Sequence, residues 1–82
     1  MKVIIADSNE LIRLGVRAAL KNDAVAEIVG EARSNQELID IIDNFGSDLV
    51  IIDYTSDGFD IDVLPKILAK HNAKTFNNKE AA

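Results

Sequence analysis

The 82-residue sequence has no cysteine, which excludes disulfide bonds, thiolate metal sites and thiol nucleophiles. Because proteins without cysteine suit a reducing compartment, we expect a cytoplasmic protein. Long hydrophobic runs are also absent. Met1 and Lys2 lead into only four apolar residues before Asp7. That is too few for a signal-peptide core or a membrane span, so no membrane association is expected.

Positive charge is scarce. Nine Lys and Arg residues stand against 14 Asp and Glu residues, the net charge is −5, and the basic residues are scattered. Binding to nucleic-acid phosphates needs a surface rich in Lys and Arg, so we expect no direct nucleic-acid binding by this segment. Proline occurs once and glycine four times, which leaves no Pro- or Gly-rich linker. With 48% hydrophobic residues, the composition indicates one small globular domain.

Three short apolar segments alternate with three amphipathic ones. Residues 3–6, 28–32 and 49–52 predict strands, and helices are expected from residue 8 or 9 to about 21, over 34–45 and over 62–71. The βαβαβα order predicts an α/β fold with a parallel sheet, helices on both faces and strand order 2-1-3. After residue 71 the pattern fails. We expect no fourth strand there, and residues 72–82 are predicted to be a polar C-terminal tail.

The first predicted helix has an apolar stripe and a basic side. Asp7 followed by Glu10 resembles a capping box, so Asp7 or Ser8 is expected to cap the helix. Arg13 and Arg17, four residues apart, are expected on the side that faces water. The residues at helical spacing that predict the buried stripe are Leu11, Leu14, Gly15, Ala18 and Leu20.

The other two helices have start and stop signals of their own. Ser34 and Glu37 form a capping box, and Gly46 supplies the C-terminal stop of the second helix. Asp62 is the expected cap of the third helix. Pro65 then falls in the first turn, where its missing N–H is not needed.

Two acidic residues stand where predicted strands end. Asp7 follows the first strand, and Asp53 follows the third, which is the strongest strand signal in the chain. If these strands are parallel neighbours, both carboxylates lie at one edge of the sheet, where open α/β folds place their binding sites. Adjacent carboxylates favour a cation or a phosphoryl group as the ligand. Read singly, Asp7 could be only a helix cap and Asp53 only a strand-end acid.

Several segments, in order and at matching spacing, resemble the receiver domain of two-component response regulators. They are residues 1–15 (MKVIIADSNELIRLG), residues 29–32 (VGEA) and residues 48–53 (DLVIID), with Gly58 five positions further on. The resemblance covers positions 1 to about 71 and is nearest to the group that carries a helix-turn-helix output domain.

This resemblance implies a flavodoxin-like fold and a phosphorelay function. A sensor histidine kinase would donate a phosphoryl group to Asp53, and Mg²⁺ would be held by Asp7, Asp53 and the main-chain carbonyl of Thr55. Phosphorylation would then control dimerisation and transcriptional output. The module itself would not be an enzyme. A small hydrolase is disfavoured because the sequence lacks a histidine cluster and a Gly-rich phosphate loop.

Two departures from the family pattern keep a second hypothesis open. Ser8 stands where the family usually has a second acid, and a hydroxyl is a poor Mg²⁺ ligand, so its role as a ligand is doubtful. The family's later strands, with their switch Ser or Thr and their Lys, are also expected to be missing, which would end the domain after the third helix. The alternative is therefore a degenerate or truncated receiver that acts as a non-phosphorylated, self-associating interaction module. Homodimers would form by edge pairing of the third strand or by exchange of elements between chains.

Overall fold

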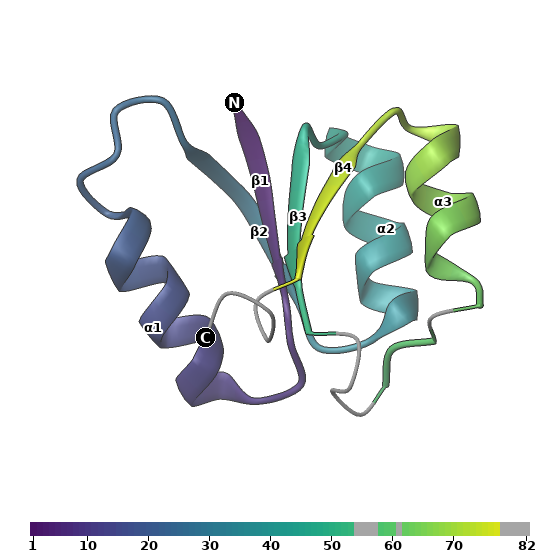
Figure 1. The fold of residues 1–82 in the computed structure, drawn as a ribbon, viewed down its shortest axis with the longest axis horizontal. Helices are drawn as coiled ribbons and strands as arrows, with labels where there is room; N and C mark the ends of the chain where they lie inside the picture. The colour runs from purple at the N-terminus through teal and green to yellow at the C-terminus, as the bar shows by residue number, and fades with distance from the viewer. Residues whose placement is uncertain (54–57, 61, 78–82) are drawn as a thin grey trace.

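The computed structural model describes residues 1–53, 58–60 and 62–77. Strands and helices alternate along the chain (Figure 1). The elements in order are β1 (Lys2–Ala6), α1 (Glu10–Leu20), β2 (Glu27–Ala32), α2 (Asn35–Phe45), β3 (Leu49–Ile52), α3 (Leu64–Lys70) and β4 (Lys74–Asn77).

The strands form one parallel sheet in the order β2-β1-β3-β4, with α1 on one face and α2 and α3 on the other (Figure 1). The predicted α/β class, the flavodoxin-like receiver arrangement and the 2-1-3 order of the first three strands are confirmed. The register aligns Ala6 with Ala32 on one side and with Ile52 on the other. The carboxyl ends of β1, β2 and β3 therefore lie together.

The expectation that no strand follows the third helix is wrong. β4 pairs with β3 from Leu49↔Lys74 to Ile52↔Asn77, so residues 74–77 belong to the sheet and not to a polar tail. As a result β3 is paired on both sides, and the proposed edge pairing of the third strand between two chains has no free edge to use. The sequence signal was weak because Phe76 is the only large apolar residue in β4.

The main core lies between the sheet and the pair α2 and α3. Its fully buried members include Ile4, Leu38, Ile42, Val50 and Leu64. Gly30 is needed where β2 passes beneath α2, because a Cβ atom built there would lie 2.8 Å from the Cγ2 atom of Ile41. That distance is shorter than real Cβ contacts, so a glycine allows the helix to sit this close to the strand.

α1 is turned differently from the prediction. Its cap is Asn9, whose side chain accepts a hydrogen bond from the N–H of Leu11 (2.9 Å), and not Asp7 or Ser8. Arg13, expected in water, is 9% exposed, whereas Leu11 is 74% exposed and Leu14 is 47% exposed. Most of the predicted apolar stripe is thus open to solvent. The face that α1 turns toward the protein includes Arg13 and the half-buried Val16 and Leu20.

α2 follows the prediction closely and α3 does so less well. Ser34 caps α2 by accepting from the N–H of Glu37, and Gly46 ends that helix with a φ of 69°. α3 is preceded by Val63 without a side-chain cap, so Asp62 is not its cap, although Pro65 does lie in the first turn. None of the described helices is long and apolar enough to cross a membrane.

Candidate functional site

β1 and β3 bring the two predicted acids to the same end of the sheet. Ala6 and Ile52 are register partners, and Asp7 and Asp53 are the next residues along their strands. Parallel neighbours run about 4.8 Å apart. The two main chains therefore leave the sheet side by side, at the carboxyl edge where open α/β folds bind ligands.

Asp7 is held firmly at this edge. It is only 5% exposed, and its N–H donates to the carbonyl of Ala32 on β2 (2.9 Å). Its Oδ1 atom accepts from the N–H of Asn9 (2.8 Å), and its carbonyl accepts from the Nη1 atom of Arg13 (2.7 Å). Hydrogen bonds from Asn9 and Arg13 thus hold Asp7 just before α1. Asp7 does not itself cap the helix, because the cap is Asn9.

A group of charged residues next to Asp7 was not predicted as functional. The Nε atom of Arg13 lies 3.3 Å from Oε1 of Glu31 on β2, and Arg17 pairs with the other oxygen of the same carboxylate. The sequence showed only two arginines four residues apart and a glutamate fourteen residues later. Their meeting depends on how α1 rotates against β2, which helical spacing alone does not determine.

The described residues include some, but not all, of the ligands expected for a Mg²⁺ ion. Mg²⁺ prefers carboxylate oxygens and commonly takes one or two of them, with water and phosphate oxygens as its other ligands. Asp7 and Asp53 provide two such groups at one edge. Ser8 is exposed beside Asp7, and Thr55 lies outside the described residues. Within the described part of the chain, no cluster of three or more His, Cys, Asp or Glu residues could hold a metal by itself.

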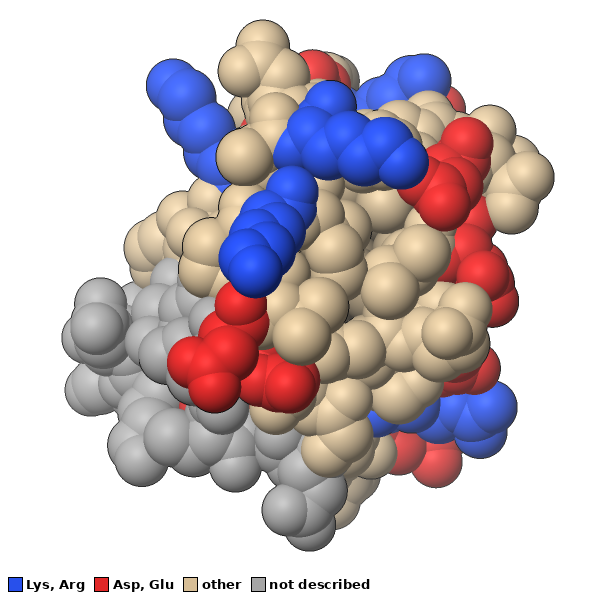
Figure 2. All heavy atoms as spheres, turned by 90° about the vertical axis from the view of Figure 1, so that its right-hand side faces the viewer, with Lys and Arg blue, Asp and Glu red and all other residues tan. Residues whose placement is uncertain are grey.

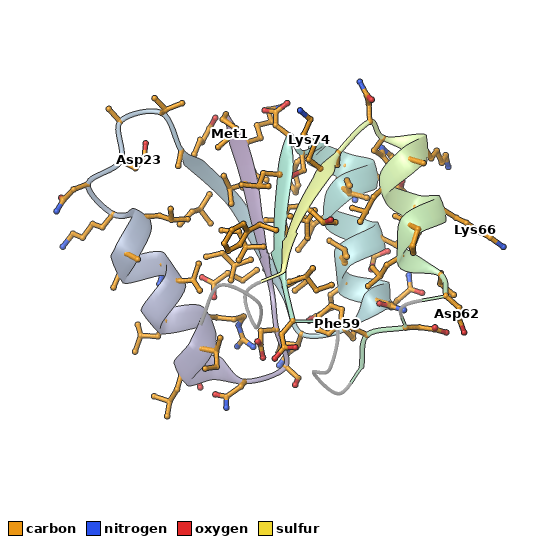
Figure 3. All side chains as sticks on the ribbon, viewed as in Figure 1. Met1, Asp23, Phe59, Asp62, Lys66 and Lys74 are labelled. Atoms are coloured by element: carbon orange, nitrogen blue, oxygen red, sulfur yellow. The ribbon has the colours of Figure 1, made fainter. Side chains whose placement is uncertain are left out.

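Gly58 and Phe59 lie near the start of α2 and the core. The N–H of Asn35 donates to the carbonyl of Gly58 (2.8 Å), and Gly58 has a φ of +90°, as expected for a position that favours glycine. Phe59 packs against the core cluster at this same end of the sheet (Figure 3). Gly58 is therefore anchored at the start of α2, and Phe59 is anchored on the core.

An ion pair on the surface joins Arg33, the residue before the cap of α2, to Glu37 in its first turn. Arg33 donates to both oxygens of Glu37, and these hydrogen bonds lower the pKa of Glu37 from 4.5 to about 2. The N–H of Arg33 donates to the same carboxylate (2.7 Å). Glu37 thus fixes the turn between β2 and α2, next to Gly58.

The surface charge agrees with the low count of basic residues. Figure 2 shows acidic and basic side chains mixed on the face that α2 and α3 present, and neither sign covers it. Lys66 of α3 points away from the protein (Figure 3). The described residues on this face form no continuous basic stripe of the kind that tracks nucleic-acid phosphates.

Known proteins that resemble this chain include response regulators. VraR of Staphylococcus aureus is 32% identical over 60 residues, which are 73% of this chain and 29% of VraR. YhcZ of Bacillus subtilis, an uncharacterized transcriptional regulatory protein, is 36% identical over 53 residues, which are 65% of this chain and 25% of YhcZ.

A solved structure has the same fold. RcsB of Salmonella typhimurium, a response regulator described for its conformational dynamism in DNA interaction, superimposes with a TM-score of 0.79 at 26% identity. The match covers 92% of this chain and 40% of RcsB. No protein-family model matches the chain. The chain thus spans less than a third of the length of VraR and YhcZ.

Proposed function

We propose, from the premise that the chain belongs to the response-regulator receiver family, that it accepts a phosphoryl group on Asp53 in a Mg²⁺-dependent reaction. The donor is the phosphohistidine of a sensor kinase, and the result is a change in the output of a transcriptional regulator. The relatives are much longer than this chain, so the output is proposed for a protein in which this module is one part.

One observation carries the proposal. The pairing of Ala6 with Ile52 brings Asp7 and Asp53 out of the sheet side by side. A phosphoryl acceptor needs a neighbouring site for a cation, because the carboxylate and the incoming phosphoryl group are both negative. Bound Mg²⁺ would screen these charges. Asp7, fixed through its carbonyl, its N–H and Oδ1, is the residue we assign to hold the cation, with the Thr55 carbonyl as a further ligand.

The proposed step is a simple displacement. A carboxylate oxygen of Asp53 attacks the phosphorus of the phosphohistidine, the P–N bond breaks as the P–O bond forms, and the released imidazole nitrogen takes a proton from solvent. The product is an acyl phosphate on Asp53. The chain contributes the nucleophile and the fixed carboxylate beside it.

Labelling with a small phosphodonor tests the proposal. Acetyl phosphate with Mg²⁺ is expected to add one phosphoryl group to the wild-type chain, seen by intact-mass spectrometry as about 80 Da, and Asp53→Asn is expected to abolish the addition. Asp48→Asn is the matched control because Asp48 lies at the opposite end of β3, where it accepts from the N–H of Lys2 (2.7 Å). A folded wild-type chain that remains unlabelled, or labelling that survives Asp53→Asn, would refute the proposal.

A second function is favoured by the exposed face of α1. Leu11, Leu14 and Ala18 are exposed there, and Leu14 and Ala18 line a mainly apolar hollow of about 480 Å³ that reaches Ile28 of β2. Exposed apolar surface of this kind is typical of association sites. In this alternative the chain is a non-phosphorylated module that self-associates, and the α1 face replaces the third-strand edge as its contact surface.

Sedimentation equilibrium tests this alternative. Self-association predicts wild-type dimers at high micromolar concentration and monomers for the double variant Leu11→Gln, Leu14→Gln. Asp53→Asn should leave the dimers unchanged if association does not depend on phosphorylation. A wild-type monomer throughout this concentration range would remove the alternative.

A further inference from the structure

Arg13 is a buried cation that the proposed reaction does not use. It is 9% exposed, and a guanidinium removed from water must be compensated by hydrogen bonds and an opposite charge. The charge is met by Glu31 on β2, and the Nη1 atom donates to the carbonyl of Asp7 (2.7 Å). One side chain from α1 thus joins the end of β1 to β2.

The bond to Asp7 fixes the main chain of a residue assigned to the cation. The main chain of Asp7 is held on both sides, by Ala32 at its N–H and by Arg13 at its carbonyl. A further hydrogen bond, from the N–H of Asn9 to Oδ1, orients the carboxylate itself. A carboxylate placed in this way loses little freedom when it binds an ion, which is how residues behind metal ligands raise affinity.

We propose that Arg13 is a positioning residue for the cation-binding carboxylate of Asp7, acting through the Asp7 main chain and held in place by Glu31. The inference deepens the proposed function and rests on it, because it assigns a role toward the same cation. Arg13 contributes no ligand. Its effect is to keep the loop over residues 7–9 in the conformation that presents the carboxylate at the sheet edge.

Charge alone predicts the opposite effect. A guanidinium near the site repels a divalent cation, so a variant that lacks it would bind Mg²⁺ more tightly if electrostatics dominated. Glu31 offsets this repulsion because its carboxylate lies against Arg13. Weaker Mg²⁺ binding after removal of Arg13 therefore indicates a positioning role, whereas tighter binding indicates simple electrostatic repulsion.

Arg17 provides the matched control. It lies one turn later on α1, pairs with the other oxygen of Glu31, and its side chain is 48% exposed. Arg17→Ala removes one of the two cations at Glu31 and keeps the bond from Arg13 to Asp7. Arg13→Ala removes the other cation at Glu31 and also the bond to Asp7. If Arg13 only attached α1 to β2, the two variants would change amide exchange and Mg²⁺ affinity to the same extent.

The first measurement is amide hydrogen exchange by NMR on the full chain without metal. In Arg13→Ala, the amides of Asp7 and Asn9 should exchange at least about tenfold faster than in Arg17→Ala. The amides of β3, which is paired on both sides, report any global loss of stability. If Arg13→Ala does not fold, Arg13→Lys takes its place. Lysine keeps the positive charge but cannot reach Asp7 and Glu31 with two separate nitrogen atoms. Arg13→Lys should therefore also speed up exchange of the Asp7 and Asn9 amides, but by a smaller factor.

The second measurement is the Mg²⁺ dissociation constant, taken from the chemical shifts of Asp7 and Asp53. Loss of a residue that orients a metal ligand weakens binding about tenfold or more, so we expect that change for Arg13→Ala and less than about twofold for Arg17→Ala. Equal effects of the two variants, or tighter binding by Arg13→Ala, would overturn the inference. A folded wild-type chain without any Mg²⁺ response would overturn the proposed function, and the exchange rates would then still decide whether Arg13 fixes Asp7.

Discussion

Replacing Gly30 with alanine tests the packing of β2 against α2 that supports the whole sheet. A Cβ atom at Gly30 would lie 2.8 Å from Cγ2, 3.0 Å from Cδ1 and 3.3 Å from Cγ1 of Ile41. Because Cγ2 is attached directly to the Cβ of a branched side chain, rotation of the chain end cannot relieve that contact. Overpacking of a core by one carbon typically costs about 1–3 kcal/mol, and we expect Gly30→Ala to lower the free energy of unfolding by that amount.

Urea denaturation followed by circular dichroism measures this change, and Gly15→Ala is the control. Gly15 lies within α1, and a methyl group added there would meet no atom within 4 Å, so alanine should raise the free energy of unfolding by about 0.5–1 kcal/mol. In the double variant with Ile41→Ala, the cost of Gly30→Ala should largely disappear, giving a coupling of about 0.5–3 kcal/mol. A Gly30→Ala chain as stable as wild type, or additive effects in the double variant, would refute the reasoning.

Three further changes test the segments around the site. Ser34→Ala should cost about 1 kcal/mol in urea denaturation because α2 loses its cap, whereas Ser34→Asp should retain most of the stability. Since Arg33 lowers the pKa of Glu37 to about 2, the stability from this pair should be present above pH 4.5 and be lost as the pH falls toward 2. A Glu37→Gln chain with the same acid titration as wild type would contradict this. Gly58→Ala should cost about 1–3 kcal/mol, because its φ is +90° and its Cβ would meet the Arg33 carbonyl at 3.0 Å; unchanged thermal unfolding would argue against such strain.

The sequence was sufficient for the parts of the fold that depend on local pattern. Buried parallel strands require continuous apolar runs, which residues 3–6 and 49–52 supply, and the alternation of elements then fixes the order of the first three strands. Ser34 and Gly46 were identified because capping depends on a few neighbouring residues. The adjacency of Asp7 and Asp53 followed from the same topology.

What the sequence did not reveal depends on contacts between distant segments. β4 is a strand because β3 pairs with it, and Lys74 and Asn77 give it little strand propensity of their own. α1 is rotated so that Arg13 meets Glu31 on β2 while Leu11 and Leu14 face solvent, and helical spacing alone does not determine that rotation. Residues 54–57, which include Thr55, lie outside the described residues, and the role assigned to Thr55 stays a prediction.

The central claim is that Asp7 and Asp53 share one cation, and a Mg²⁺ titration followed by NMR tests it most directly. The amides of Asp7 and Asp53 should shift with one common dissociation constant, and either Asp7→Asn or Asp53→Asn should weaken the response at both positions. Separate dissociation constants at the two residues, or a response at Asp7 that Asp53→Asn leaves unchanged, would contradict the account.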